Sequence, residues 1–136
     1  MRVLVDTDLN KILREEGITD VYLCQLATEV KNGNHDGELI RNLLFKKRVN
    51  SHAKGASNGP RSIVAHKAGG NMFFIDFYLK NDPPKKNKKE RKYKEEIPPP
   101  RMKIYKELAR SLLAQDDAGI KITIDNGEFR EVNCNG

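Results

Sequence analysis

Apolar residues recur with helical spacing near both ends of the chain and with strand-like alternation between them. Near the N-terminus, Leu9, Ile12 and Leu13 follow the i, i+3, i+4 pattern of a helix that is buried on one side. This pattern predicts a helix over residues 7–16. Residues 2–5, just before it, are apolar enough to form a short edge strand.

Polar residues and glycines mark where the helices begin and end. Asp6 and Thr7 offer an N-cap for the first helix, and Gly17 ends it because glycine readily adopts the left-handed conformation. A second helix is predicted to begin at Thr19 and to end at Asn32-Gly33. Its buried stripe would comprise Val21, Leu23, Leu26, Ala27 and Val30. The two helices predict a helical hairpin, whose acidic outer face argues against contact with nucleic acid.

Strand-like segments occupy the middle of the chain, after a turn-rich loop at residues 34–38. Strands are predicted over residues 43–49, 61–66 and 71–80. A polar loop at residues 50–60 joins the first two. The third contains Met72–Leu79, the most apolar segment of the chain, which favours a central position in the sheet.

Alternation within the first of these strands leaves its orientation open. Phe45 and Lys47 would lie on one side of the sheet, and Lys46 and Arg48 on the other. The pattern does not show which side is buried, so it does not assign these cations to the open face.

Helical spacing returns at Arg101 and continues to Gln115. The face expected to be buried comprises Met102, Tyr105, Leu108, Ala109, Leu112 and Leu113. Residues 120–124 fit either a helical turn or a strand, and a strand is predicted over residues 128–133. The order α-α-β-β-β-α-β predicts an α+β fold, in which a small antiparallel β-sheet is packed by the N-terminal helical hairpin and the later helix.

A length of 136 residues suits one domain with its own core. We expect residues 1–136 to form a single domain that carries a Lys/Pro-rich insertion at residues 83–100. Residues 85–94 hold seven basic side chains against one acidic. A solvated, partly disordered loop is one interpretation of this run, and attraction to an RNA backbone is the other.

Basic residues also concentrate in the predicted strands. The net charge is +6, yet Leu39 to Ile75 contains no Asp or Glu, whereas residues 1–38 carry four basic and eight acidic side chains. Like charges packed so densely repel one another, which favours an anionic partner with a repeating charge. Nucleic acid fits better than a membrane, because no apolar amphipathic face accompanies the lysines.

The cysteines and the N-terminus indicate the compartment. Cys24 and Cys134 are the only two cysteines and form no CxxC motif, so we expect neither a disulfide framework nor a zinc site. No apolar run is long enough to span a membrane, and residues 1–6 lack the apolar region of a signal peptide. These features predict a soluble, cytoplasmic protein that contacts no membrane.

Three strings occur in order along the chain. They are Phe45-Lys46-Lys47-Arg48-Val49 with the small-residue loop from Ala53 to Arg61, the aromatic segment Phe73 to Asp82, and Gly127-Glu128-Phe129-Arg130-Glu131-Val132. Together with the helix at residues 101–115, they resemble the RelE/ParE superfamily of type II toxin–antitoxin toxins, and most closely its HigB-like branch. The resemblance covers nearly the whole chain.

The resemblance implies a compact sheet with the helical hairpin on one side and a basic concave surface on the other. Many members of the superfamily are ribosome-dependent endoribonucleases that cut mRNA, and others poison DNA gyrase. The implied partners are a cognate antitoxin, the ribosome and mRNA. The chain departs from the family pattern at Pro60, which precedes Arg61, and in the length of its insertion. A non-catalytic basic module that binds nucleic acid is the remaining alternative.

RNA cleavage by internal attack requires a deprotonated 2′-OH, a neutralised pentavalent phosphorane and a protonated 5′-oxygen. Arg61 suits the second task, since a guanidinium holds two phosphate oxygens at once, and the resemblance points to the same residue. A surface arginine paired with Asp76 or Glu131 is the structural alternative. Lys80 and Lys54 are candidates for substrate positioning or proton transfer.

Tyr78 is the fourth catalytic candidate, because it could stack on a base or donate a proton, although an aromatic residue in so apolar a strand also suits core packing. The candidate RNA-binding residues are Arg48, Lys47, Lys46 and Lys67. His52 and His66 invite a two-histidine mechanism, but nothing in the sequence places them together. No Asp, Glu or His spacing suggests a metal site, so we expect a metal-free mechanism without a cofactor.

Overall fold

The computed structural model describes residues 1–49, 60–79 and 97–134, and within them six strands form one sheet. The strands are β1 (Val3–Asp6), β2 (Gly37–Ile40), β3 (Leu44–Arg48), β4 (Pro60–His66), β5 (Met72–Leu79) and β6 (Phe129–Val132). Their order across the sheet is β2-β3-β4-β5-β1-β6, and the pairs are antiparallel except for β1 and β5. The predicted α+β fold class is confirmed.

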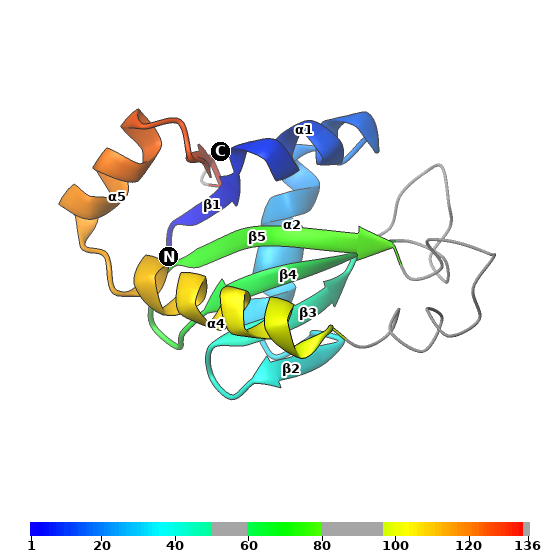
Figure 1. Ribbon diagram of the computed structural model, residues 1–136. Coiled ribbons are helices and arrows are strands. Elements are labelled where there is room, and N and C mark those ends of the chain that lie inside the picture. The colour runs from blue at the N-terminus through cyan, green and yellow to red at the C-terminus, as the bar shows by residue number, and fades with distance from the viewer. Residues whose placement is uncertain (50–59, 80–96, 135–136) are drawn as a thin grey trace.

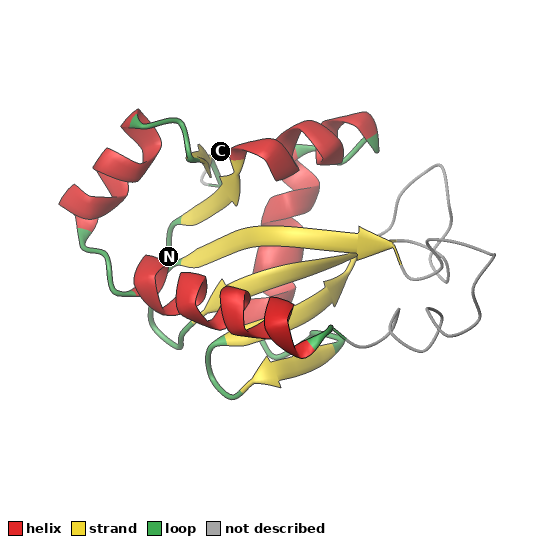
Figure 2. Ribbon diagram, viewed as in Figure 1, coloured by secondary structure: helices red, strands yellow, loops and turns green. Residues whose placement is uncertain are grey.

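Helices cover both faces of this sheet, as Figures 1 and 2 show. Helices α1 (Thr7–Glu15) and α2 (Asp20–Lys31) pack on one face. Helix α4 (Pro99–Leu113) crosses the other face in front of β3, β4 and β5, and α5 (Asp117–Asp125) packs into the same core as α4. The sheet is therefore the middle layer of three.

The central strands are apolar because both of their faces are buried. Phe73 points into the core on the α4 face, and Phe74 points into the core on the α2 face. The Phe73 ring packs edge-on against Phe129, with 5.6 Å between the ring centroids. A strand that is buried on both faces reads as a continuous apolar run, which explains the pattern of Met72–Leu79.

Of the two N-cap candidates for the first helix, Asp6 is the cap and Thr7 is the first residue of α1, and Thr19, where the second helix was predicted to begin, caps α2. Asp6 accepts a hydrogen bond from the backbone N–H of Leu9 at 2.9 Å, and Thr19 accepts one from that of Tyr22 at 3.1 Å. Gly17 has φ +80°, the left-handed conformation expected of a residue that ends a helix.

Three local predictions were wrong or incomplete. β1 is not an edge strand, because the C-terminal strand β6 returns to pair with its outer side. The loop expected at residues 34–38 contains the start of β2, in which Gly37 pairs with Lys46. Residues 120–124 are helical, since Asp116 caps α5 by accepting a hydrogen bond from the N–H of Gly119 at 2.8 Å.

Several side chains expected in the core are exposed. Val21 is 80% exposed, and Ile12 and Leu108 lie at the margins of their helix faces with 42% and 36% exposed. Ile18, in the connection between α1 and α2, is buried in the core on that face instead.

The C-terminal part of the predicted insertion is helical. Pro99 and Pro100 form the first turn of α4, where the absent N–H of proline costs no hydrogen bond. Residues 83–96 lie outside the described part of the chain.

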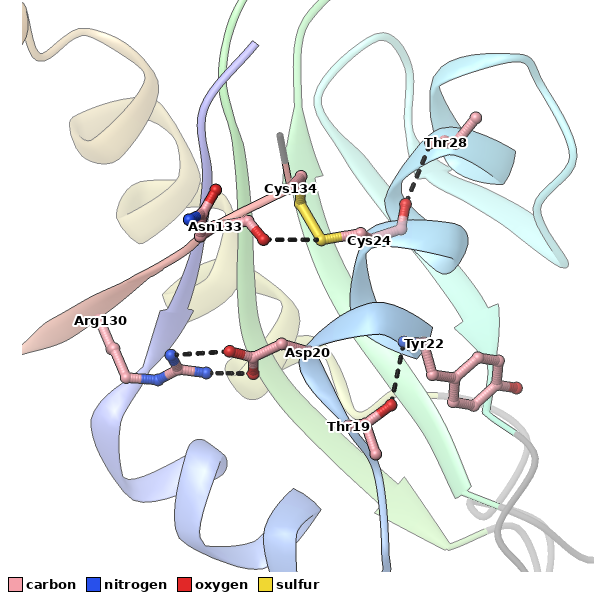
Figure 3. The surroundings of a disulfide bond; sticks show 8 residues. All are labelled: Thr19, Asp20, Tyr22, Cys24, Thr28, Arg130, Asn133 and Cys134. Atoms are coloured by element: carbon pink, nitrogen blue, oxygen red, sulfur yellow. Dashed lines mark hydrogen bonds and ion pairs between the residues drawn. A yellow bond between two sulfur atoms is a disulfide. The ribbon is translucent and has the colours of Figure 1, made fainter. Parts of the chain in front are cut away.

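Cys24 and Cys134 form a disulfide, contrary to our expectation of unpaired cysteines. The bond joins α2 to the end of β6, with 5.5 Å between the two Cα atoms (Figure 3). Nearby, Arg130 of β6 donates to both carboxylate oxygens of Asp20, at 2.6 and 3.2 Å, and lowers the pKa of that carboxyl. The disulfide could not be predicted from the sequence, because the two cysteines are 110 positions apart and only the pairing of β6 with β1 brings them together.

Candidate nucleic-acid interface

The register of β3, β4 and β5 places three predicted site residues in one line. Arg61 on β4 lies opposite Arg48 on β3 and opposite Tyr78 on β5. Paired residues on neighbouring strands point to the same face of a sheet, so the three side chains share a face. Ile63, two residues after Arg61, is buried in the core on the α4 face, so this is the face in question.

Lys46 extends this line into a cluster. It lies two residues before Arg48 on β3, on the same face, and its Cα partner on β4 is Ile63. We call Lys46, Arg48, Arg61 and Tyr78 the basic row. Arg48 is exposed, Lys46 and Tyr78 are half-buried, and Arg61 is only 6% exposed. The row is thus most buried at Arg61, between Arg48 and Tyr78, and most exposed at Arg48.

The positive charges of Arg48 and Arg61 lie opposite each other on neighbouring strands. Like charges directly opposite across two strands repel, and the repulsion is stronger where water is excluded, as at Arg61. An anion between Arg48 and Arg61 would replace this repulsion with attraction. A phosphate suits the position, because each guanidinium can donate to two of its oxygens.

Helix α4 contributes a second cluster beside the row. Asp76 of β5 accepts hydrogen bonds through Oδ2 from the hydroxyl of Tyr105 and from Nη1 of Arg101, the latter at 3.3 Å. Burial raises the pKa of the Tyr105 hydroxyl to about 12, and the contact with Tyr105 raises the pKa of Arg101 above its ordinary value. We call these three residues the Asp76 cluster.

Lys47 is not part of the basic row. It points to the opposite face, where its ammonium lies 2.8 Å from Glu29 of α2 and donates to the carbonyl oxygen of Asn34 at 3.0 Å. This contact lowers the pKa of Glu29. Lys47 is buried, so the structure gives it a place in the packing of α2 on the sheet.

Lys67 and His66 lie at the far end of β4 from Arg61. His66 is five positions along the strand from Arg61, which corresponds to roughly 17 Å. His66 donates from Nδ1 to the carbonyl oxygen of Asn71 at 3.1 Å, and Lys67 is exposed in the turn that follows. The structure therefore does not bring either residue to the basic row. Lys54, Lys80 and His52 lie outside the described part of the chain.

The two carboxylates considered as partners for Arg61 have other contacts. Asp76 belongs to the cluster just described, and Glu131 accepts two hydrogen bonds from Arg2 at 2.9 Å each. The contact with Arg2 lowers the pKa of Glu131.

Residues 1–49, 60–79 and 97–134 contain neither a metal-binding group nor a membrane-spanning helix. No three His, Cys, Asp or Glu side chains there are grouped so that they could hold a metal ion. In the same part of the chain, none of the helices has the length and apolar character needed to cross a membrane.

The geometry defines a three-layer α+β protein with a row of cations where β3 and β5 end and β4 begins. A family model described as the RelE toxin of the RelE/RelB toxin–antitoxin system matches residues 1–132. The chain belongs to this family of toxins, and membership implies an antitoxin partner. No curated protein and no solved structure gives a significant match. The family match does not distinguish the HigB-like branch, which stays a prediction.

The resemblance implied a basic concave surface on the second face. Helix α4 lies across that face, and the basic row is confined to the end beside the first turns of α4.

Sequence reasoning treated Arg101 and Tyr105 only as parts of a helix. Their i, i+4 spacing places both on one side of that helix, but nothing in the sequence shows that this side meets Asp76.

Proposed function

We propose that this toxin is a ribosome-dependent endoribonuclease that cleaves mRNA by attack of the 2′-OH, without a metal ion. Family membership supports a toxin role, and the opposition of Arg48 and Arg61 supports a phosphate as ligand. Of these, the paired arginines are the observation that carries the proposal. Directly opposite residues have Cβ atoms about 5 Å apart, so both guanidinium groups can reach the same phosphate.

In this proposal Arg61 stabilises the transition state. The phosphorane carries more negative charge than the phosphodiester from which it forms, so a cation at that point lowers the barrier. Burial of Arg61 strengthens the effect, because little water screens the interaction. The proposed site therefore places its most buried cation in the middle of the basic row, between Arg48 and Tyr78.

The remaining residues of the row take supporting roles. Arg48 and Lys46 bind the flanking phosphates, and Tyr78 stacks on a base or donates a proton. Lys54 and Lys80, which lie outside the described residues, remain our candidates for positioning and proton transfer, because crowding by neighbouring cations can lower the pKa of a lysine. We leave Lys47 and Lys67 out of the proposed site because of where they lie.

The proposed partners follow from the same activity. A cognate antitoxin would silence the toxin, and the ribosome would hold the mRNA with its 2′-oxygen in line with the scissile bond between phosphorus and the 5′-oxygen. We place the toxin in the HigB-like branch, on the strength of the three strings in its sequence.

The test compares mRNA cleavage in a purified translation mixture by wild-type protein, Arg61→Ala and Arg61→Lys. Loss of a transition-state donor typically lowers the rate by about 100- to 1,000-fold, which we expect for Arg61→Ala. Arg61→Lys keeps the charge and loses the two-pronged contact, so an intermediate rate is expected.

Arg41→Ala is the matched control, since it removes an exposed arginine from the turn between β2 and β3, at the other end of β3 from Arg48. Urea unfolding of each variant separates a lost contact from a lost fold, because Arg61 is buried. Cleavage by a folded Arg61→Ala protein at the rate of Arg41→Ala would refute the role of Arg61. Absence of cleavage by the wild-type protein would refute the activity itself.

A further inference from the structure

The Asp76 cluster lies beside the basic row. Asp76 comes two residues before Tyr78 on β5, so their Cα atoms are about 7 Å apart and their side chains share a face. Across the sheet, the Cα partner of Asp76 is Ile63, two residues from Arg61. The contacts of Asp76 with Tyr105 and Arg101 therefore anchor the first turns of α4 at a position two residues along the strands from the row.

Within this cluster, Tyr105 and Arg101 differ in exposure. Tyr105 is buried, and its hydroxyl donates to the carboxylate of Asp76, which fixes that carboxylate in place. The side chain of Arg101 is 61% exposed, and its contact with Asp76 is made through Nη1. A guanidinium has five N–H donors, so the contacts of Arg101 with Asp76 and Tyr105 leave others that can reach a ligand.

We infer that Arg101 is a further phosphate-binding residue, which Asp76 and Tyr105 position for the phosphate next to the one held by the basic row. The inference rests on the proposed function, and it extends the RNA path from the sheet onto α4. Asp76 and Tyr105 are positioning residues, since they act through Arg101.

The negative charge of Asp76 weakens the long-range attraction of Arg101 for RNA. It does not prevent a direct contact, because an exposed ion pair contributes little stability and is screened by salt. The hydrogen bond from Tyr105 continues to stabilise the Asp76 carboxylate when Arg101 turns toward a phosphate. The expected contribution of Arg101 is therefore short-range and directional, and it depends on Asp76.

The experiment measures binding of the full-length protein to a single-stranded 2′-O-methyl RNA, which 2′-OH attack cannot cleave. Fluorescence anisotropy at several salt concentrations gives both Kd and its salt dependence. For Arg101→Ala we expect Kd to rise roughly 5-fold or more. The slope of log affinity against log salt should fall by about 0.7, the value for one phosphate contact on a single strand.

Arg110→Ala is the matched control, because Arg110 is an exposed arginine of the same helix, nine residues further along. Nine residues of helix correspond to about 13.5 Å, which moves its guanidinium away from the row. If Arg101→Ala weakens binding no more than Arg110→Ala does, the inference fails, and only the overall charge of α4 matters.

A double-mutant cycle tests the role of Asp76. If Asp76 positions Arg101, Arg101→Ala should cost less in the Asp76→Asn background than in the wild type. Equal costs in both backgrounds would overturn the positioning role. Weak binding by Arg61→Ala together with normal binding by Arg101→Ala would support the basic row and reject this extension. A wild-type protein that does not bind RNA would reject both.

Discussion

The disulfide between Cys24 and Cys134 should make the stability of this toxin depend on redox conditions. The bond spans 110 residues of sequence and joins α2 to the end of β6. Reduction leaves β6 attached through its pairing with β1 and through the contact between Arg130 and Asp20. We therefore expect the reduced protein to keep its fold and to lose free energy of unfolding.

The size of the loss follows from the length of the closed loop. A cross-link over about 110 residues lowers the entropy of the unfolded chain by an amount worth roughly 5 kcal/mol at room temperature. Native disulfides typically contribute about 2–5 kcal/mol when they are removed. For a protein of this size, whose total stability is of the order of 5–15 kcal/mol, such a loss is a large fraction.

The assay is urea unfolding of the wild-type protein with and without a dithiol reductant, with Cys24→Ser/Cys134→Ser as the control. The oxidised wild type should unfold at higher urea than the other states, by the equivalent of about 2–5 kcal/mol. The double variant should not respond to reductant. Equal midpoints for the oxidised and reduced wild type would refute the reasoning, and so would two reactive thiols in the native protein under oxidising conditions.

Two further predictions concern packing and charge. Lys47 lowers the pKa of Glu29 below its ordinary value of 4.5, so this contact stabilises the fold above that pH and is lost as the pH falls through the folded pKa. The stability difference between wild type and Lys47→Met in urea should therefore shrink on acidification below pH 4.5; a constant difference would contradict this account. Phe73→Ala should cost about 3–5 kcal/mol because Phe73 is fully buried, whereas Val21→Ala, at an 80% exposed site, should stay within about 0.5 kcal/mol, and similar costs would contradict the assigned burial.

Local sequence features were enough to predict much of the secondary structure. The caps at Asp6 and Thr19 and the glycine at residue 17 act within a few residues, so their positions followed from the sequence. The apolar run at Met72–Leu79 also predicted a central strand, and the structure shows that strand buried on both faces. These features depend on local backbone chemistry and on burial, which a sequence shows directly.

Contacts between residues far apart in the chain could not be predicted from the sequence. The place of β1 inside the sheet and the Cys24–Cys134 bond both depend on the return of β6 across more than 100 residues. The orientation of β3 was also undecided, because both of its faces carry cations. The structure separates them: Lys47 meets Glu29 of α2, while Arg48 joins Arg61 on the other face.

Part of the candidate site could be predicted, namely that Arg48, Arg61 and Tyr78 belong to neighbouring strands. Their alignment in one row required the strand register, which no local pattern supplies. The contribution of Arg101 required the docking of α4 on Asp76, a contact between residues 25 positions apart.

The central claim is that the end of the sheet that carries Arg48 and Arg61, and not positive charge in general, binds the scissile region of the RNA. Single-turnover cleavage of ribosome-bound mRNA by Arg48→Ala, Arg61→Ala, Arg41→Ala and Lys67→Ala tests it most directly, since each variant removes one positive charge. The account predicts large losses for Arg61→Ala and Arg48→Ala, and rates near wild type for the two variants at the other end of the sheet. Equal losses across all four variants would contradict it.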